Sequence, residues 1–232
     1  MELIWEGLKK AFFLLITLDP EVLHITFLSL KVSGIATLIS LLLGITLGTA
    51  LALNEFLGRR FLVSLVNTGM GLPPVVVGLF VTILLWRSGP LGFLGILYTP
   101  TAIIIAQAVI ATPLVTGITM AAMQALPKNL RLQILALGAT RWQMIWFLIK
   151  EAKIPLLAGA MAGFGGVISE VGASIMVGGN IKGYSRVLTT ATVMETSKGN
   201  FDLAIALSII LLLLAYLINT VLTQIQQRER PR

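Results

Sequence analysis

The sequence predicts an all-α protein that crosses a membrane several times. Of its 232 residues, 56% are hydrophobic and 12% are charged, whereas roughly 25% are charged in soluble domains. The mean hydropathy is +0.94. Long apolar stretches alternate with connections that hold most of the basic residues. Because so few polar residues cannot cover a water-facing surface, a polytopic membrane protein is expected.

Five stretches are long and apolar enough to span a bilayer, whose hydrocarbon core of about 30 Å needs about 20 helical residues. They cover residues 25–53, 61–86, 101–123, 156–177 and 201–222. The second contains Pro73 and Pro74 and the third contains Pro113. Proline removes a backbone donor, so the second stretch is predicted to be kinked.

Residues 1–20 form a separate N-terminal unit. Trp5, Leu8, Phe12 and Leu15 recur at helical spacing beside acidic and basic residues. This pattern predicts an amphipathic helix lying on the membrane surface, which ends at Asp19-Pro20. A short, tilted sixth span is the alternative.

Basic residues in the connections predict the orientation. One set of connections holds ten of them and the other set holds six, with Lys31 left out as intramembrane. The first set is Arg59, Arg60, Lys128, Arg131, Arg141, Lys150, Lys153, Arg228, Arg230 and Arg232; the second is Lys9, Lys10, Arg87, Lys182, Arg186 and Lys198. Since basic residues accumulate on the cytoplasmic side, the N-terminus is expected outside and the C-terminus inside.

Composition excludes several functions. Without cysteine there is no disulfide, thiol nucleophile or thiolate metal ligand. The net charge of +7 comes from basic residues that lie mostly between the spans. Membrane orientation, which places basic residues in cytoplasmic connections, explains this charge better than nucleic-acid binding does. His24 is the only histidine, so neither a metal site nor a histidine-based triad is expected. The sequence has no G-x-x-x-x-G-K-[ST] motif. The chain is therefore expected to be a non-enzyme without a cofactor or an ATP site of its own.

The longest inside connection covers residues 126–154 and is rich in large apolar residues. Pro127 can start a helix at Lys128, and Gly138-Ala139 permits a sharp turn before a second helix that begins near Trp142. Two interpretations remain open from these residues alone. The segment is either an amphipathic loop resting on the membrane or a docking element for a cytosolic partner.

This segment resembles the coupling motif of ABC importer permeases, the inner-membrane components of binding-protein-dependent transport systems. The resemblance rests on Ala136-Leu137-Gly138-Ala139, on Trp142 four residues after the glycine, and on Ile154-Pro155 before the next span. It extends over residues 20–225, so residues 21–225 are expected to form a type I transmembrane domain and 226–232 a basic cytoplasmic tail. The family role implies that the ATPase contacts Ala136, Leu137, Gly138, Ala139, Thr140, Arg141 and Trp142.

Within that family the sequence is most similar to tungstate permeases, relatives of the molybdate and sulfate permeases. Residues 72–79, 87–92 and 169–203 carry this similarity. It implies a homodimer in a prokaryotic cell membrane, two ATPase subunits that bind ATP and Mg²⁺, and an extracytoplasmic oxyanion-binding protein. Alternatives are a permease for molybdate, sulfate or another small solute, or an ion-coupled secondary transporter. For the last, Glu170 is the only carboxylate well inside a predicted span.

Three groups of residues are candidates for function within the membrane and outside it. Lys31 and Glu170 are intramembrane charges, which are costly and often functional. Lys31 either snorkels to the interface or lends positive potential to an anion route, whereas a structural role is favoured for Glu170, since it would repel an oxyanion. Lys182, Arg186 and Lys198 are candidates for docking the binding protein. Candidates for the transport path or gate are Asn67, Thr68, Pro73, Pro74, Gln107, Thr112, Pro113, Ser169 and Ser174.

Overall fold

The structure, a computed structural model, describes residues 2–228 apart from the side chains of residues 2, 3 and 128. Arg230 and Arg232 of the predicted basic tail lie outside the described residues. Within residues 2–228 the elements are α1 (Glu2–Ile16), α2 (Pro20–Leu53), α3 (Arg59–Met70), α4 (Pro74–Leu85), the 3-10 helix η1 (Gly92–Leu94), α5 (Pro100–Gln124), α6 (Lys128–Ala136), α7 (Arg141–Glu151), α8 (Lys153–Ile168), α9 (Gly172–Gly178), α10 (Leu188–Ser197) and α11 (Phe201–Arg228).

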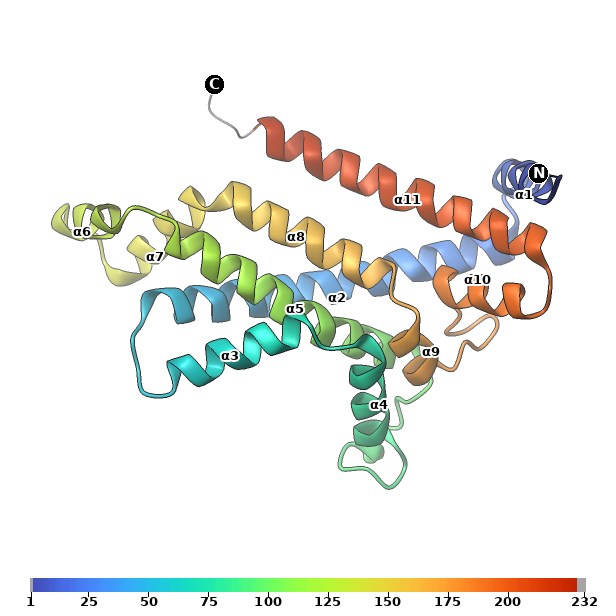
Figure 1. The fold of residues 1–232 in the computed structure, drawn as a ribbon, viewed down its shortest axis with the longest axis horizontal. Coiled ribbons are helices and arrows are strands. Elements are labelled where there is room, and N and C mark those ends of the chain that lie inside the picture. The colour runs from blue at the N-terminus through green and yellow to red at the C-terminus, as the bar shows by residue number, and fades with distance from the viewer. Residues whose placement is uncertain (1, 229–232) are drawn as a thin grey trace.

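The long helices run along the molecule's long axis, and the short ones gather at its two ends. Figure 1 shows α6 and α7 at one end, here called the α6 end, and α1 and α10 at the opposite α1 end. The connection between α2 and α3 and the end of α11 also lie at the α6 end, while α4 projects sideways from the bundle. The two sets of connections that differ in basic residues therefore lie mainly at opposite ends.

Among the described residues, α2, α5 and α11 are each long and apolar enough to cross a membrane. The second predicted stretch is broken more sharply than a kink, because α3 and α4 meet at 107°. Pro73 precedes α4 and Pro74 opens it. The fourth stretch, predicted to be continuous from 156 to 177, is also broken, since α8 and α9 meet at 59°. If each bent pair makes one crossing, the total is five.

The first helix packs across α11 through its small residues. A Cβ atom at Gly7 would lie 2.3 Å from Cγ2 of Ile205, and Ala11 is buried. The predicted apolar face of Trp5, Leu8, Phe12 and Leu15 points away from the protein and is exposed. At 1.5 Å per residue, the 15 residues of α1 extend about 22 Å, less than the hydrocarbon thickness. These features fit an interfacial helix, which stays a prediction.

The helix end predicted at Asp19-Pro20 is confirmed, since α1 ends at Ile16 and α2 begins at Pro20. The Asp19 carboxylate accepts hydrogen bonds from the backbone N–H groups of Glu21 and Val22, both at 3.0 Å. Pro20 occupies the first turn of α2, where its missing N–H has no partner to lose.

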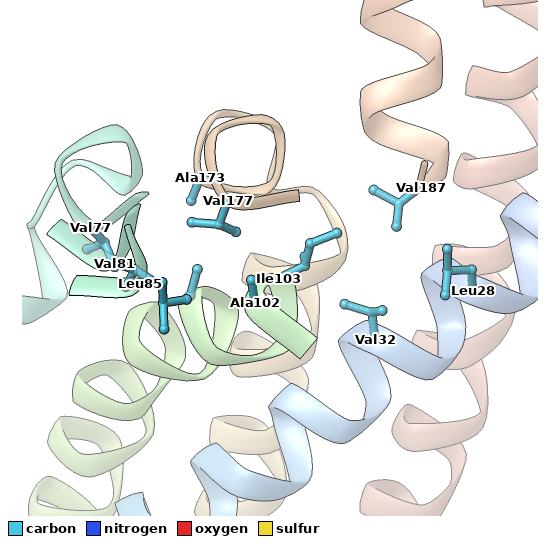
Figure 2. Packing of buried hydrophobic residues seen from close by; sticks show 11 residues of the cluster. Leu28, Val32, Val77, Val81, Leu85, Ala102, Ile103, Ala173, Val177 and Val187 are labelled. Atoms are coloured by element: carbon cyan, nitrogen blue, oxygen red, sulfur yellow. The ribbon is translucent and has the colours of Figure 1, made fainter. Parts of the chain in front are cut away.

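One buried cluster holds the short helices α4 and α9 against α2 and α5 (Figure 2). Its residues include Leu28, Val32, Val77, Val81, Leu85, Ala102, Ile103, Ala173, Val177 and Val187. Next to Val77 of this cluster, a Cβ atom at Gly78 would lie 2.7 Å from Cα of Ala173. Only glycine allows α4 and α9 to approach so closely. The two helices that follow the breaks therefore pack on one another.

Glycine also brings α2 and α5 together. A Cβ atom at Gly48 would lie 2.6 Å from the carbonyl oxygen of Thr116, and one at Gly44 would lie 2.7 Å from Cβ of Val115. Ser40 Oγ donates a hydrogen bond to the Ala108 carbonyl oxygen, at 3.2 Å. Gly34 on the same helix has no atom within 4 Å of such a Cβ. These tight glycine contacts between the two candidate spans lie in the second half of α2.

Candidate coupling surface and transport path

The turn between α6 and α7 is fixed by its own backbone. Gly138 has a φ of +84°, a conformation that favours glycine. Thr140 then caps α7: the Gln143 N–H donates to Thr140 Oγ1 at 3.3 Å, and the Thr140 N–H donates to Gln143 Oε1 at 2.8 Å. This capping box satisfies two N–H groups at the helix start. The predicted turn at Gly138-Ala139 is confirmed as a helix–turn–helix.

The turn presents an apolar surface to its surroundings. Leu137 is 88% exposed and Trp142 is 82% exposed. Ala136, Gly138, Thr140 and Arg141 are also exposed, and Ala139 is half-buried. A single exposed Leu or Trp needs no explanation, but both beside a rigid turn favour a surface that a partner covers. The docking role itself stays a prediction.

The opposite face of α7 anchors the turn to the membrane helices. Met144 and Leu148 are buried in a cluster with Met123 of α5 and Leu156 of α8. Arg131 on α6 donates a hydrogen bond to the Leu53 carbonyl oxygen at the end of α2, at 3.0 Å. The turn is therefore tied by packing or a hydrogen bond to three of the bundle's helices, α2, α5 and α8.

Glu170 lies in the break between α8 and α9. The predicted continuous span of residues 156–177 placed it inside a helix, which is wrong. Its Oε1 accepts a hydrogen bond from the Ala173 N–H at 2.9 Å, and its carbonyl oxygen accepts one from Thr189 Oγ1 at 2.9 Å. Glu170 is buried. It supplies an acceptor to the first turn of α9 and joins the break to α10, an arrangement that fits the structural role favoured from the sequence.

Replacing Glu170 with leucine is expected to destabilise the break by about 1–3 kcal/mol, because the buried Ala173 N–H then loses its acceptor. Glu170→Gln keeps a side-chain oxygen and should lose less. The measurement is the thermal unfolding midpoint of the purified assembly. Equal midpoints for both variants and the wild-type chain would exclude this capping role.

Of the predicted path residues, the structure brings Gln107 and Ser174 together. The Gln107 side-chain amide donates to the Val167 carbonyl oxygen at 3.0 Å and to Ser174 Oγ at 3.4 Å. Both residues are buried, so in this conformation they brace the break between α8 and α9. Gln107 Oε1 has no hydrogen-bond partner within residues 2–228. An unsatisfied buried acceptor is costly. A conformation of the protein that gives Gln107 Oε1 a hydrogen-bond donor would therefore be favoured at this position.

The other path candidates divide by exposure. Asn67, Thr68, Pro73 and Ser169 are exposed on the single chain, and Pro74, Thr112 and Pro113 are half-buried. Pro113 lies inside α5 without ending it, and a Cβ atom at Gly69 on α3 would lie 2.8 Å from its ring. The four exposed residues are available to line a transport path. Their role in transport stays a prediction.

Lys31 lies on an exposed apolar stripe of α2. Phe27 precedes it and Ile35, Leu38 and Leu42 follow it at helical spacing on the same face, and all four are exposed. A stripe of this kind is typical of lipid contact, so its position fits the snorkelling interpretation better than the anion-route one.

The three basic docking candidates are all engaged in ion pairs within the chain. Lys182 Nζ lies 2.7 Å from Glu21 Oε2, and Arg186 Nη1 lies 3.7 Å from Glu21 Oε1. Lys198 Nζ lies 2.8 Å from Glu195 Oε1. The Arg186 side chain is only 9% exposed, so of the three candidates only Lys182 and Lys198 are accessible to a docking partner. Sequence analysis missed Glu21 as a partner, because the pairing spans more than 160 residues.

The ion pair and hydrogen bond of Glu195 are expected to make the stability of the protein depend on pH. Asn200 Nδ2 donates to its Oε2 at 2.7 Å, and this bond, with that from Lys198, holds the pKa of Glu195 below its ordinary value of 4.5. The resulting stabilisation is complete above pH 4.5 and is lost as the pH falls through the lowered folded-state pKa. In detergent, the unfolding midpoint should therefore fall less between pH 5 and pH 3 for Glu195→Gln than for the wild-type chain. The exposed Glu6→Gln should follow the wild-type chain; identical profiles for all three would contradict the prediction.

The fold is that of a type I ABC importer transmembrane domain. It matches an inward-facing structure of the MetNI methionine ABC transporter with a TM-score of 0.77 at 20% identity, covering 92% of this chain and 99% of that one. A bacterial alginate ABC transporter, solved with an alginate-bound periplasmic protein, also matches with a TM-score of 0.77 at 20% identity, over 96% of this chain and 86% of that one. At these identities the likeness concerns the fold.

The chain belongs to the family of binding-protein-dependent transport system inner membrane components, whose model matches residues 40–232. It is 43% identical to the tungstate uptake system permease protein TupB of Peptoclostridium acidaminophilum, over 98% of this chain and all of that one. It is 38% identical to a probable anion ABC transporter permease protein of Haloferax volcanii, over 90% and 92%. It is 31% identical to the molybdenum transport permease ModB of Escherichia coli strain K12, over 93% and 99%. The resemblance stated from the sequence is confirmed: the chain is a multi-pass membrane protein and an ABC importer permease subunit.

Proposed function

We propose that this permease carries an oxyanion across the membrane, and that the oxyanion is tungstate. The observation that carries the proposal is the 43% identity, along essentially the whole chain, to a tungstate uptake permease. The lower identity to a molybdenum permease makes molybdate the second candidate. Tungstate and molybdate carry the same charge and tetrahedral shape, so a path that passes one is expected to admit the other.

The permease is proposed to work as a homodimer with two ATPase subunits, which bind ATP and Mg²⁺. The rigid, apolar turn at Gly138 supports ATPase docking at the α6 end, because it offers an exposed contact that is anchored to α2, α5 and α8. An oxyanion-binding protein would dock at the α1 end. This arrangement places the N-terminus outside and the C-terminus in the cytoplasm, in agreement with the basic residues at the α6 end.

In the proposed cycle, ATP binding closes the ATPase dimer and draws the two turns together. Because α7 packs on α5 and α8 through Met144 and Leu148, this motion rotates the helices and opens the path outward. Hydrolysis reverses the motion. The breaks at Pro73 and Glu170 separate α4 from α3 and α9 from α8, so neither pair of helices has to move as one continuous rod.

The test is ATP hydrolysis by the complete complex of permease, ATPase and binding protein in proteoliposomes, with tungstate, molybdate and sulfate compared. Selective stimulation by tungstate is the expected result. Stimulation by none of the three in an assembled complex would leave an ABC permease and reject the oxyanion. Uptake driven by an ion gradient in the chain alone would reject the ABC mechanism in favour of secondary transport.

A further inference from the structure

We propose that one face of α3 lines a water-filled vestibule that forms the cytoplasmic half of the transport path, and that Arg60 at its mouth is the charge that draws an anion into it. The position of the vestibule goes beyond the proposed function, whereas the identity of the anion rests on it. Three features of the chain support it: the polar face of α3, the free charge of Arg60, and a long interval without carboxylates.

One face of α3 is polar. Its residues recur in steps of four, three and four along the chain: Arg60, Ser64, Asn67 and, at the C-cap, Gly71. In a helix this spacing places them on one side. All four are exposed on the single chain, and the side chains of Ser64 and Asn67 make no hydrogen bond within residues 2–228. Facing lipid, both side chains would lack partners, which is costly, whereas a water-filled cavity supplies them.

The opposite side of α3 packs on α5, and the helix covers the inner half of the bundle. A Cβ atom at Gly69 would lie 2.8 Å from the ring of Pro113, near the middle of α5. At the other end of α3, Arg59 Nε donates a hydrogen bond to the Leu51 carbonyl oxygen in the last turn of α2, at 2.8 Å. The 12 residues of α3 extend about 18 Å. The polar face therefore runs from the α6 end to about the middle of the membrane (Figure 1).

The two arginines at the start of α3 have different surroundings. Arg59 is half-buried, and its Nη1 lies 3.6 Å from Glu55 Oε1. Arg60 is exposed and makes neither an ion pair nor a hydrogen bond in the part of the chain that the structure describes. Because Glu55 is paired with Arg59, the charge of Arg60 is uncompensated. Ser64 lies one turn further along the same face, so this charge acts on whatever enters the vestibule.

The sequence around the vestibule contains no negative side chain. Neither aspartate nor glutamate occurs between Glu55 and Glu151, an interval that includes all of α3, α4, α5 and α6. A carboxylate beside the path would repel an anion and hold a cation. A cleft lined by charges of one sign also raises the local concentration of ions of the opposite sign. The charge of this interval is therefore complementary to an anion, which favours an anion over a cation as the occupant.

Two other arrangements of α3 make different predictions. If a second copy of the chain covers the polar face, water does not reach Ser64 or Asn67. If α3 lies on the membrane surface, its exposed apolar residues meet water as its polar residues do. Leu65 is such an apolar residue, 58% exposed on the single chain and directed away from the polar face. The accessibility of Ser64 and Leu65 to a water-soluble reagent therefore distinguishes the three arrangements.

The experiment measures the reaction of single introduced cysteines with charged, membrane-impermeant methanethiosulfonates. Because the chain has no cysteine of its own, any label on it lies on the introduced residue. The complete permease–ATPase complex is labelled in proteoliposomes from the ATPase side without nucleotide, and the mass of the permease chain reports the reaction. Ser64→Cys and Asn67→Cys are expected to react, since the reactive thiolate forms in water. Leu65→Cys, facing lipid, should react at least about tenfold more slowly.

The role of Arg60 is tested by comparing an anionic with a cationic reagent at Ser64→Cys. Adding Arg60→Gln should lower the ratio of the anionic to the cationic reaction rate about fivefold, because the two reagents respond to the lost charge in opposite senses. Arg228→Gln is the matched control. It removes an exposed arginine at the same end of the bundle, but from α11, and should leave the ratio unchanged.

Three results would overturn the proposal: no reaction at Ser64→Cys, equal rates at Ser64→Cys and Leu65→Cys, or an unchanged ratio in Arg60→Gln. None of these measurements uses tungstate. If no oxyanion stimulates ATP hydrolysis while the labelling pattern and the preference for the anionic reagent hold, the tungstate assignment fails and the vestibule stands.

Discussion

Replacing Gly48 with alanine is expected to produce the largest loss of stability among single-methyl changes on α2. The added Cβ atom would lie 2.6 Å from the Thr116 carbonyl oxygen and 2.6 Å from Thr119 Cβ. A backbone oxygen inside α5 cannot rotate away, so the two helices must separate along their contact. Overpacking of this kind costs about 1–3 kcal/mol. The measurement is the unfolding midpoint in detergent, together with the yield of assembled complex.

Gly34→Ala is the matched control, since it makes the same chemical change on the same helix. No atom lies within 4 Å of its added Cβ, and alanine is a better helix former than glycine by about 1 kcal/mol. Its midpoint should equal or exceed that of the wild-type chain. If both variants behaved alike, the α2–α5 contact described here would be wrong.

Replacing Gly138 with valine is expected to lower the ratio of transport to ATP hydrolysis by about tenfold or more. The φ of +84° disfavours any residue with a Cβ, by about 1–2 kcal/mol, and a β-branched one by more. Nothing lies within 4 Å of the added Cβ, so relief comes through the backbone. Relaxation of φ changes the angle between α6 and α7, which displaces the exposed Leu137 and Trp142. Transport and substrate-stimulated ATPase activity, measured in proteoliposomes, report the effect.

Gly199→Val separates uncoupling from general strain. Gly199 has a φ of +80° and equally open surroundings, but it lies at the opposite end, between α10 and α11. This variant should lose a similar amount of stability and keep its coupling. Full coupling in an assembled Gly138→Val complex would show that the turn's geometry does not matter to the ATPase.

Features set by neighbouring residues could be predicted from the sequence. Asp19-Pro20, Pro127 and Gly138 each act on the backbone within a few residues, and each marks an observed helix boundary or turn. The long spans follow from apolar length alone. The break after Ile168 was not predicted, although Ser169 and Glu170 interrupt the apolar run there, since the bonds that brace it come from Gln107 and Thr189, far away in the chain.

The candidate site divides in the same way. The turn at Gly138 is a local motif and its position is predicted correctly, whereas the surroundings of Arg186 depend on α2 reaching the segment before α10. Gly34 and Gly48 are the same residue on the same helix, yet only the second touches α5. Which face of a helix meets a partner is a property of the whole bundle when the helix is apolar on every side.

The packing of α1 on α11 joins the first and last helices of the described chain, so it can form only late in synthesis. Gly7 and Ala11 pack on α11, and Lys10 pairs with Asp202, 192 residues later. The ribosome therefore releases the first helix long before its partner exists. During that interval the small-residue face of α1 has nothing to pack against. A message truncated before residue 201 would yield a membrane protein with this helix left undocked, a state that a quality-control protease could distinguish from the finished chain.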